Sequence, residues 1–301
     1  MRVGVVFPQT EIGPDVGAVR DYTVAAEEMG YHYLQIYDHV LGADTTNRPN
    51  WTGAYRLEDQ FHEVMVVFGY MAAITRSIEL VTGVLVLPQR QTALVAKQAA
   101  EVDLLSNGRL TLGVGVGWNA VEFEALSEDF HTRGRRIEEQ IAVLRELWTT
   151  PSVNFQGRFM TIPDAGINPL PIQRPIPIWM GGSSPPVQER VGRLADGWLP
   201  QWRVFPSVEQ MRAAIANVHD AARAAGRDPS HLAIAGVMSI GRNSPDQWRQ
   251  EALDWLAAGA THMAVNTMGA GLASPDEHVA ALRRFVAEVV PAVEEADAGR
   301  S

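Results

Sequence analysis

The chain has no cysteine among its 301 residues. Disulfide bridges, thiolate nucleophiles and cysteine-ligated metal sites are therefore excluded. Positive charge is also scarce, because 25 lysines and arginines stand against 35 aspartates and glutamates, for a formal net charge of −10. Nucleic acids and acidic membranes require a concentrated positive field. We therefore expect a small-molecule partner, with no nucleic acid and no membrane.

Long hydrophobic runs are missing as well. The longest apolar stretch, Val64–Ile74, is too short to span a bilayer. The N-terminal run Val3–Phe7 is ended early by Pro8, which predicts a buried strand and not a secretory signal. The sequence therefore predicts a cytoplasmic protein. Its 8 histidines show no metal-ligand spacing such as H-E-x-x-H, so we expect no protein-bound metal.

Short apolar runs alternate with amphipathic segments along nearly the whole chain, which is typical of repeated β-α units. The eight expected strands are Val3–Phe7, Tyr33–Tyr37, Leu80–Leu87, Leu110–Val116, Ile176–Met180, Gly197–Gln201, Leu232–Ile240 and Met263–Thr267. The expected helices are Val16–Met29, Thr92–Leu105, Arg135–Trp148, Val187–Leu194, Val208–Ala225, Gln247–Ala258 and Glu277–Ala296. This count predicts an α/β fold, a closed (β/α)8 TIM barrel, as a single domain over residues 1–301.

The main rival is an open, doubly wound sheet. That fold usually places a glycine-rich turn after its first strand, and here the turn is Pro8–Pro14, without the dinucleotide fingerprint. Two segments interrupt the β-α rhythm: residues 42–60, with Trp51 and Tyr55, and residues 150–174, rich in proline and glycine. Because long loops in a compact barrel are usually functional, we expect both to cover the strand ends and to shape the substrate pocket.

The active site of such a barrel lies at the carboxyl ends of its strands. Asp38 and His39 directly follow the second expected strand. A neutral imidazole can exchange a proton near pH 7, and a neighbouring carboxylate can set its charge or bind a polar ring edge. The alternative is that Asp38 caps the next segment while His39 only packs. The strand-end position favours the functional interpretation.

Glycines mark the third and fourth expected strands. Gly83 interrupts the third strand, which indicates a bulge, a close approach to the backbone or simple packing. Gly113, Gly115 and Gly117 alternate and strip one face of the fourth strand of side chains. A planar ring could lie on that face, or a neighbouring helix could pack closely there. Arg90, after the third strand, could meet a ligand anion.

The sharpest local signal follows the fifth expected strand. Gly181, Gly182 and Ser183 form a turn that leads through Ser184 into a helix. Backbone N–H groups of glycines and the dipole of a helix N-terminus favour an anion, so the turn predicts a phosphate site. A plain N-cap explains Ser184 and Pro185 equally well. It does not require two preceding glycines, however, and this favours the phosphate.

Together these motifs resemble the bacterial luciferase-like monooxygenase superfamily, and within it the coenzyme F420-dependent oxidoreductases of actinobacteria. The matching stretches occur in family order across nearly the whole chain. They are Tyr37–His39, Thr82–Arg90 followed by Ala96–Gln98, Leu105–Trp118, Arg133–Arg136 and Pro177–Ser184. The resemblance implies a luciferase-like barrel interrupted by an insertion, with a flavin or deazaflavin lying across the strand ends.

Residue roles follow from the resemblance by position. Asp38 would contact the deazaflavin ring, and His39 would be the catalytic residue beside the reacting carbon. Gly83 and Val84 would form the bulge behind the ring, often a cis peptide in this family. Gly117 would lie near the cofactor.

The phosphate region and the substrate pocket follow in the same way. Gly181, Gly182 and Ser183 would hold the phosphate region of the cofactor. Trp118 stands where F420-dependent sugar-phosphate dehydrogenases have an acid-base glutamate, which argues against oxidation of glucose 6-phosphate. Trp118 and Trp202, both after strands, are the candidates for the substrate pocket.

The resemblance implies an F420-dependent oxidoreductase that transfers a hydride between the deazaflavin and a small organic substrate. One alternative is an FMN-dependent monooxygenase that uses reduced flavin and oxygen. Another is a catalytically silent barrel that only binds cofactor. A homodimer, and a reductase that supplies reduced flavin or F420, are the partners that the resemblance implies.

Overall fold

The computed structural model describes residues 1–241 and 243–299. Trp202 was predicted to line the pocket, but its side chain lies outside the described part. Its barrel strands are β1 (Arg2–Val6), β2 (Tyr33–Ile36), β3 (Glu79–Thr82), β4 (Leu85–Val86), β5 (Leu110–Gly115), β8 (Ile178–Gly181), β9 (Gly197–Leu199), β10 (Ala233–Ser239) and β11 (His262–Asn266). They are parallel in the order β3-β2-β1-β11-β10-β9-β8-β5-β4, and pairing of β3 with β5 closes the ring. Since β3 and β4 are two halves of one barrel strand, the predicted eight-stranded barrel is confirmed.

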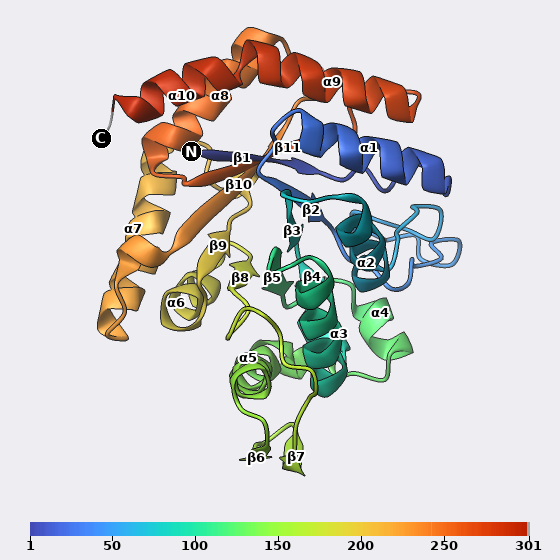
Figure 1. Ribbon diagram of the computed structural model, residues 1–301, viewed down its shortest axis with the longest axis vertical. Coiled ribbons are helices and arrows are strands. Elements are labelled where there is room, and N and C mark those ends of the chain that lie inside the picture. Colours follow the sequence, from blue (N-terminus) through green and yellow to red (C-terminus); the bar gives the residue numbers. More distant parts are fainter. Residues whose placement is uncertain (242, 300–301) are drawn as a thin grey trace.

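Helices surround the strands (Figure 1). They are α1 (Val16–Glu28), α2 (Val64–Ile74), α3 (Thr92–Leu105), α4 (Ala120–Ala125), α5 (Arg133–Thr149), α6 (Pro185–Leu194), α7 (Val208–Ala224), α8 (Pro245–Ala258), α9 (Pro275–Glu288) and α10 (Val290–Ala298). The last predicted helix, Glu277–Ala296, is wrong as one element. It is broken at Val289, because Pro291 has no N–H to donate and its ring crowds the preceding turn. In the described part of the chain, no helix combines the length and apolarity that crossing a membrane requires.

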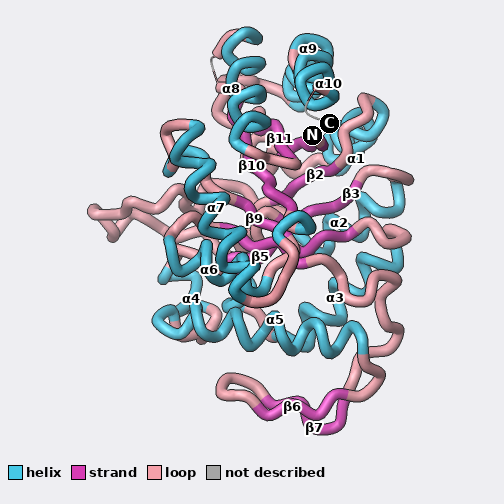
Figure 2. The backbone as a smooth tube through the Cα atoms, turned by 90° about the vertical axis from the view of Figure 1, so that its left-hand side faces the viewer, coloured by secondary structure: helices cyan, strands magenta, loops and turns pink. Residues whose placement is uncertain are grey.

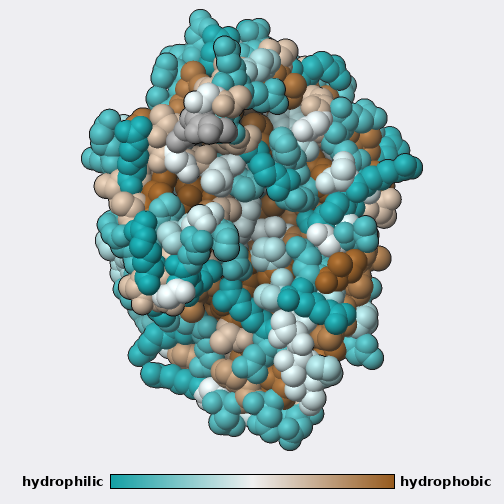
Figure 3. Space-filling view, turned by 60° about the vertical axis from the view of Figure 1, so that its left-hand side comes forward, coloured by the Kyte–Doolittle hydropathy of each residue, from teal (hydrophilic) through white to brown (hydrophobic). Residues whose placement is uncertain are grey.

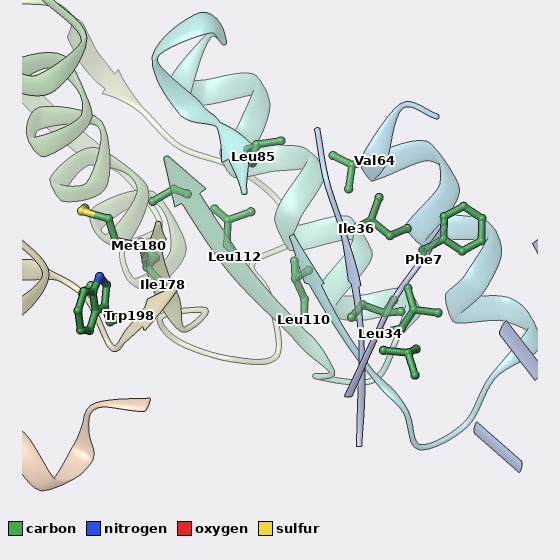
Figure 4. Close-up of a cluster of buried hydrophobic side chains, with 14 of the residues drawn as sticks. Phe7, Leu34, Ile36, Val64, Leu85, Leu110, Leu112, Ile178, Met180 and Trp198 are labelled. Carbon is green, nitrogen blue, oxygen red and sulfur yellow. The ribbon is translucent and has the colours of Figure 1, made fainter. Parts of the chain in front are cut away.

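The core has two layers, because successive side chains of a strand point to opposite faces. Val3 and Val5 of β1 pack outward with the large cluster between strands and helices, part of which Figure 4 shows. Val6 points inward, as do Tyr33, Val81, Trp179, Leu199, Ala235 and Ala264, which fill the barrel. Bulky rings fit inside only because facing residues are small. A Cβ on Gly4 would lie 2.6 Å from the Tyr33 ring.

The two interrupting segments leave different kinds of element: one follows a strand and the other follows a helix. Residues 42–60 connect β2 to α2, so they leave the barrel at the carboxyl ends of the strands, as expected. Residues 150–174 contain an antiparallel hairpin, β6 (Val153–Gln156) and β7 (Thr161–Ala165), beside α5 in both views (Figures 1 and 2).

The expectation that residues 150–174 cover the carboxyl ends of the strands is wrong. The segment joins a helix to the next strand, and such connections return the chain to the end where strands begin. Accordingly, the Gln173 side chain donates a 2.7 Å hydrogen bond to the carbonyl of Leu110, the first residue of β5. The tip of the hairpin is held by Glu139 of α5, which accepts from the N–H groups of residues 158, 159 and 160.

The face of the molecule in Figure 3 is mostly polar. On the face in Figure 3, hydrophobic residues gather only in small patches between hydrophilic ones. Since broad apolar patches mark large interfaces, this view alone suggests no extended apolar docking face. The residues that could carry chemistry are instead found at the strand ends.

Candidate functional site

His39 lies just beyond β2 and meets a carboxylate from across the barrel mouth. Its Nδ1 is 3.0 Å from Oε2 of Glu122, which belongs to α4, the short helix that follows β5. Only 9% of the His39 side chain is exposed, and the Glu122 side chain is fully buried. The barrel therefore brings together two residues that are 83 positions apart in the chain.

Glu122 is also bound to the backbone that follows His39. Its Oε1 accepts hydrogen bonds from the N–H groups of Val40 and Leu41. Burial alone would raise the pKa of the Glu122 carboxyl. The hydrogen bond and charge of His39, together with these two N–H groups, outweigh burial and lower that pKa. Glu122 is therefore ionised at neutral pH.

The sequence interpretation missed Glu122. A usable signal existed, because Glu122 follows the fourth barrel strand closely, and strand ends carry the functional residues of such barrels. The interpretation stopped four positions earlier, at Trp118. The structure places that indole beside His39 with 5.4 Å between ring centroids, and Trp118 is 41% exposed.

Aromatic rings of the first interrupting segment surround His39. The ring centroid of Tyr55 lies 5.2 Å from that of His39, and the Phe61 centroid lies 4.9 Å away. Trp51 packs on Trp118 at 5.8 Å. Tyr55 of segment 42–60 and Phe61, just after it, therefore border the imidazole together with Trp118. Phe61 was not singled out in the sequence.

The Asp38 side chain is buried and bonds residues other than His39. Its Oδ1 accepts a 2.7 Å hydrogen bond from the Arg90 guanidinium, and its Oδ2 accepts from the N–H of Val86 at 3.0 Å. Burial raises the pKa of Asp38, and Arg90 and Val86 oppose that rise without cancelling it. Arg90 also donates to Glu63 at 2.9 Å. Two carboxylates of the chain therefore engage the Arg90 guanidinium, and its contact with a ligand anion stays a prediction.

The peptide bond between Gly83 and Val84 is cis, as the resemblance implied. This bond lies between β3 and β4, and the Val84 side chain lies close to a glycine of β5 and a glycine of β8. A Cβ on Gly115 would lie 2.4 Å from Val84 Cγ2, and one on Gly181 would lie 2.5 Å from Val84 Cγ1. Val84 therefore occupies the space beside both glycines.

This packing explains the alternating glycines of the fourth barrel strand. A Cβ on Gly113 would collide with the Thr82 carbonyl, and one on Gly117 would lie 2.5 Å from Val86. Of the two interpretations made from the sequence, close packing of a helix is confirmed only at Gly117, where a Cβ would lie 3.1 Å from Phe123 of α4, and a planar ring near this strand stays a prediction. Thr82, Val84 and Val86 of the adjacent barrel strand lie against these three glycines.

The turn after β8 is built as a cradle. Gly182 has φ of +120°, a backbone conformation that favours glycine. The Ser183 hydroxyl accepts from the N–H of Gln201 at 2.9 Å, and the Gly182 carbonyl accepts from the Trp198 indole at 2.7 Å. These contacts anchor the turn to β9 and to the chain that follows it.

The helix after this turn contributes fewer N–H donors to a phosphate site than the sequence predicts. The first two residues of α6 are Pro185 and Pro186, which have no N–H, so the first turn of this helix offers fewer donors than expected. Ser184 is the N-cap, yet its hydroxyl makes no capping hydrogen bond. The turn fits an anion through the helix dipole, the serine hydroxyl and the turn's own backbone. The residues present therefore fit a phosphate-bearing cofactor.

The opposite mouth of the barrel, where strands begin, holds a cavity of about 380 Å³ lined by Arg2, Glu79, Trp179 and His262 among others. Arg2 and Glu79 form a two-fold hydrogen-bonded pair there. Chemistry in this type of barrel belongs to the other mouth. Within residues 1–241 and 243–299, no three His, Asp or Glu side chains gather closely enough to hold a metal ion.

Comparisons with known proteins show the family of the chain. A model of the family described as luciferase-like monooxygenase matches residues 1–298. The FMNH2-dependent dimethylsulfone monooxygenase of Pseudomonas putida is 30% identical over 87% of this chain and 69% of its own length. The F420-dependent glucose-6-phosphate dehydrogenase of Amycolatopsis mediterranei is 31% identical over 66% of this chain. The chain spans only 57% of that dehydrogenase's length.

Solved structures agree on the fold. An F420-dependent secondary alcohol dehydrogenase, determined in complex with an F420-acetone adduct, superposes with a TM-score of 0.79. The match covers 97% of this chain and 98% of that one. At 18% identity, this likeness shows a shared architecture and nothing about the substrate.

Proposed function

The chain belongs to the luciferase-like monooxygenase family, and we propose that it is an oxidoreductase that transfers a hydride between coenzyme F420 and a small organic substrate. The observation that carries the proposal is the position of His39 at the strand ends, paired with ionised Glu122 and bordered by aromatic rings. A bound deazaflavin would supply or accept the hydride, while the protein binds, orients and manages the proton.

His39 is the proposed proton-exchange residue. Its Nδ1 faces Glu122, so Nε2 is the nitrogen left for the substrate. When the substrate is oxidised, the proton that leaves it passes to Nε2; when the substrate is reduced, Nε2 returns that proton. Trp118, Tyr55 and Phe61 border the same ring and would exclude water from the transfer.

Cofactor binding is proposed at two places. Gly181, Gly182 and Ser183 would hold the phosphate region, and the bulge of Gly83 and Val84 would support the ring, with Gly117 nearby. Asp38 is buried and bonded to Arg90 and Val86, so we propose that it acts on the ring by fixing β4 behind it.

The FMN-dependent monooxygenase stays a second candidate. The observation that favours it is the FMNH2-dependent relative from Pseudomonas putida, which aligns with 87% of this chain. Reduced FMN would use oxygen, whereas reduced F420 carries out two-electron reductions. A homodimer and a reductase that supplies the reduced cofactor stay predictions, the first testable by sedimentation velocity.

The test is a fluorescence-quenching titration of the purified protein with F420 and with FMN. Tight F420 binding without FMN binding supports the proposal. Turnover that needs reduced FMN and oxygen would select the second candidate. Cofactor binding with no turnover of any alcohol, ketone, aldehyde or enone in a broad panel would favour a silent barrel.

The role of His39 is tested in the same assay with His39→Ala. We expect normal cofactor binding and at least a hundredfold loss of turnover, since general acid-base catalysis contributes about 10²–10⁴-fold. His131→Ala, at an exposed histidine, is the matched control and should retain full activity. Full turnover by His39→Ala would refute the assignment.

A further inference from the structure

Glu122 holds both the side chain of His39 and the backbone that follows it. We propose that Glu122 is a positioning residue: it fixes the His39 ring in one orientation and tautomer, and it ties that ring to the start of segment 42–60. This inference rests on the proposed function, in which His39 exchanges the proton.

The contacts of the carboxylate divide cleanly between its two oxygens. Oε2 meets Nδ1 of His39 at 3.0 Å, and Oε1 accepts from the N–H groups of Val40 and of Leu41, the latter at 3.1 Å. All three partners are consecutive residues beyond β2. Because Glu122 is fully buried, solvent does not compete for these hydrogen bonds.

The charge of Glu122 decides which ring nitrogen of His39 carries the hydrogen. An ionised carboxylate only accepts hydrogen bonds, so Nδ1 must donate to it. In the neutral imidazole Nε2 then has a free lone pair and can accept a proton from the substrate. When the ring is protonated, the buried carboxylate stabilises the imidazolium, as an aspartate does in a serine-protease triad.

The other polar groups near the ring do not compete for this role. Asp38 is the neighbouring residue, but both of its oxygens are bonded elsewhere, to Arg90 and to the Val86 N–H. The Tyr55 ring packs against His39, and burial raises the pKa of its hydroxyl, which stays neutral. Among the contacts that the structure describes for the His39 ring, Glu122 supplies the negative charge.

The Glu122 carboxylate also links the imidazole of His39 to segment 42–60, which is proposed to shape the substrate pocket. Val40 and Leu41 directly precede segment 42–60, which carries Tyr55 and is followed by Phe61, and both of these aromatic rings pack on His39. The segment is thus fastened at its start by Glu122 and at its far end by ring packing. A change at Glu122 should therefore disturb the imidazole and the segment together.

A purely structural role makes a different prediction. In that case Glu122 would only satisfy the N–H groups of Val40 and Leu41. Glu122→Gln keeps a carbonyl oxygen for these donors, but its amide nitrogen donates to Nδ1 and cannot accept from it. The variant therefore separates support of the backbone from control of the tautomer.

The decisive measurement is the tautomer of His39, read from ¹⁵N chemical shifts of histidine-labelled protein without cofactor near neutral pH. We expect hydrogen on Nδ1 in the wild type and a shift toward hydrogen on Nε2 in Glu122→Gln. Glu124→Gln is the matched control, because Glu124 is exposed on the same helix. His39→Ala identifies the resonance.

Turnover and hydrogen exchange complete the test. Glu122→Gln should lose about a hundredfold or more of kcat, since a wrong tautomer costs up to 10⁴-fold in a triad. Exchange of the Leu41 amide should accelerate only modestly, because a carbonyl acceptor remains. Glu122→Asp, which restores the charge, should recover part of the activity and the wild-type tautomer.

The outcomes distinguish failure of the positioning role of Glu122 from failure of the proposed function. An unchanged tautomer in Glu122→Gln overturns the positioning role and leaves the function of His39 intact. Full turnover by His39→Ala overturns the proposed function, whatever the tautomer. If Glu122→Gln does not fold, the wild-type spectrum still decides, because hydrogen on Nε2 in the wild type would overturn the inference.

Discussion

The guanidinium of Arg90 lies 2.7 Å from the Asp38 carboxylate, and both side chains are largely withdrawn from water. The ion pair joins the end of β2 to the chain that follows β4. Through the Val86 N–H, Asp38 also fixes β4 itself. Arg90, which the sequence suggested only as a contact to a ligand anion, therefore helps to shape the mouth of the barrel.

Replacing Arg90 should be costly. Arg90→Met leaves the buried Asp38 carboxylate without its cation, and breaking a buried pair from one side costs about 3–5 kcal/mol. We expect that loss in the free energy of unfolding, measured by urea denaturation at pH 7. Arg20→Met removes an exposed pair with Asp21 and should leave the urea midpoint unchanged. Equal midpoints for both variants would contradict the role given to Arg90.

Gly115 should not tolerate a methyl group. A Cβ added at position 115 would lie 2.4 Å from the Val84 side chain, and overpacking a filled site costs about 1–3 kcal/mol. Gly115→Ala should therefore lower the free energy of unfolding, and adding Val84→Ala should recover part of the loss. A Cβ added at Gly69 in α2 would have no atom within 4 Å, so Gly69→Ala should raise the free energy of unfolding by about 0.5–1 kcal/mol. A stable Gly115→Ala protein would show that Val84 does not fill this space.

His262, at the opposite mouth, should make stability depend on pH. Burial, and then the charge of Arg2, lower its pKa from 6.5 to about 4. Above pH 6.5 the ring is neutral in both folded and unfolded protein. As pH falls from 6.5 to 4, the unfolded chain binds a proton that the folded protein refuses, so stability is lost, by about 3 kcal/mol at most.

The measurement for His262 is urea denaturation at half-unit steps between pH 7 and pH 4. His262→Gln should lose less stability over this range than the wild type. His231 lines the same cavity, but its side chain is 85% exposed, and His231→Gln should follow the wild-type curve. Identical curves for all three proteins would show that His262 titrates freely in the folded state.

Gly182 should matter for cofactor affinity more than for folding. A side chain at φ of +120° strains the turn that is proposed to hold the phosphate region. We expect Gly182→Ala to raise the Kd for F420 about tenfold, equivalent to about 1.4 kcal/mol. Gly226→Ala is the control, because Gly226 also has a positive φ of +72° but follows α7, away from the turn. An unchanged Kd in Gly182→Ala would exclude this turn from the cofactor site.

The two interrupting segments should differ in their effect on substrate. Tyr55→Ala removes a ring that packs on His39, so we expect KM to change at least tenfold while F420 binding persists. Phe159→Ala, in the hairpin that α5 holds, should leave KM unchanged. Steady-state kinetics with one substrate compares them directly. A large effect of Phe159→Ala would restore that hairpin as a substrate element.

Much of the architecture could be predicted from the sequence because it depends on local pattern. Each of the eight predicted strands has its counterpart, and Thr92–Leu105 is found with the predicted bounds. Apolar runs on both faces, separated by amphipathic stretches, have few solutions other than a helix-covered parallel barrel. The order of elements also predicts the place of residues 150–174, since a connection from helix to strand begins and ends at the mouth where the strands begin.

What the sequence determined by itself, then, was the barrel, the family resemblance and the position of His39 at a strand end. The tertiary structure alone decided the partners: Glu122 for His39, Arg90 for Asp38, and Val84 for its two glycines. The physical reason is that periodicity records which face of an element is buried. Hydrogen bonds and steric contacts between strands far apart in the chain depend instead on how the barrel closes.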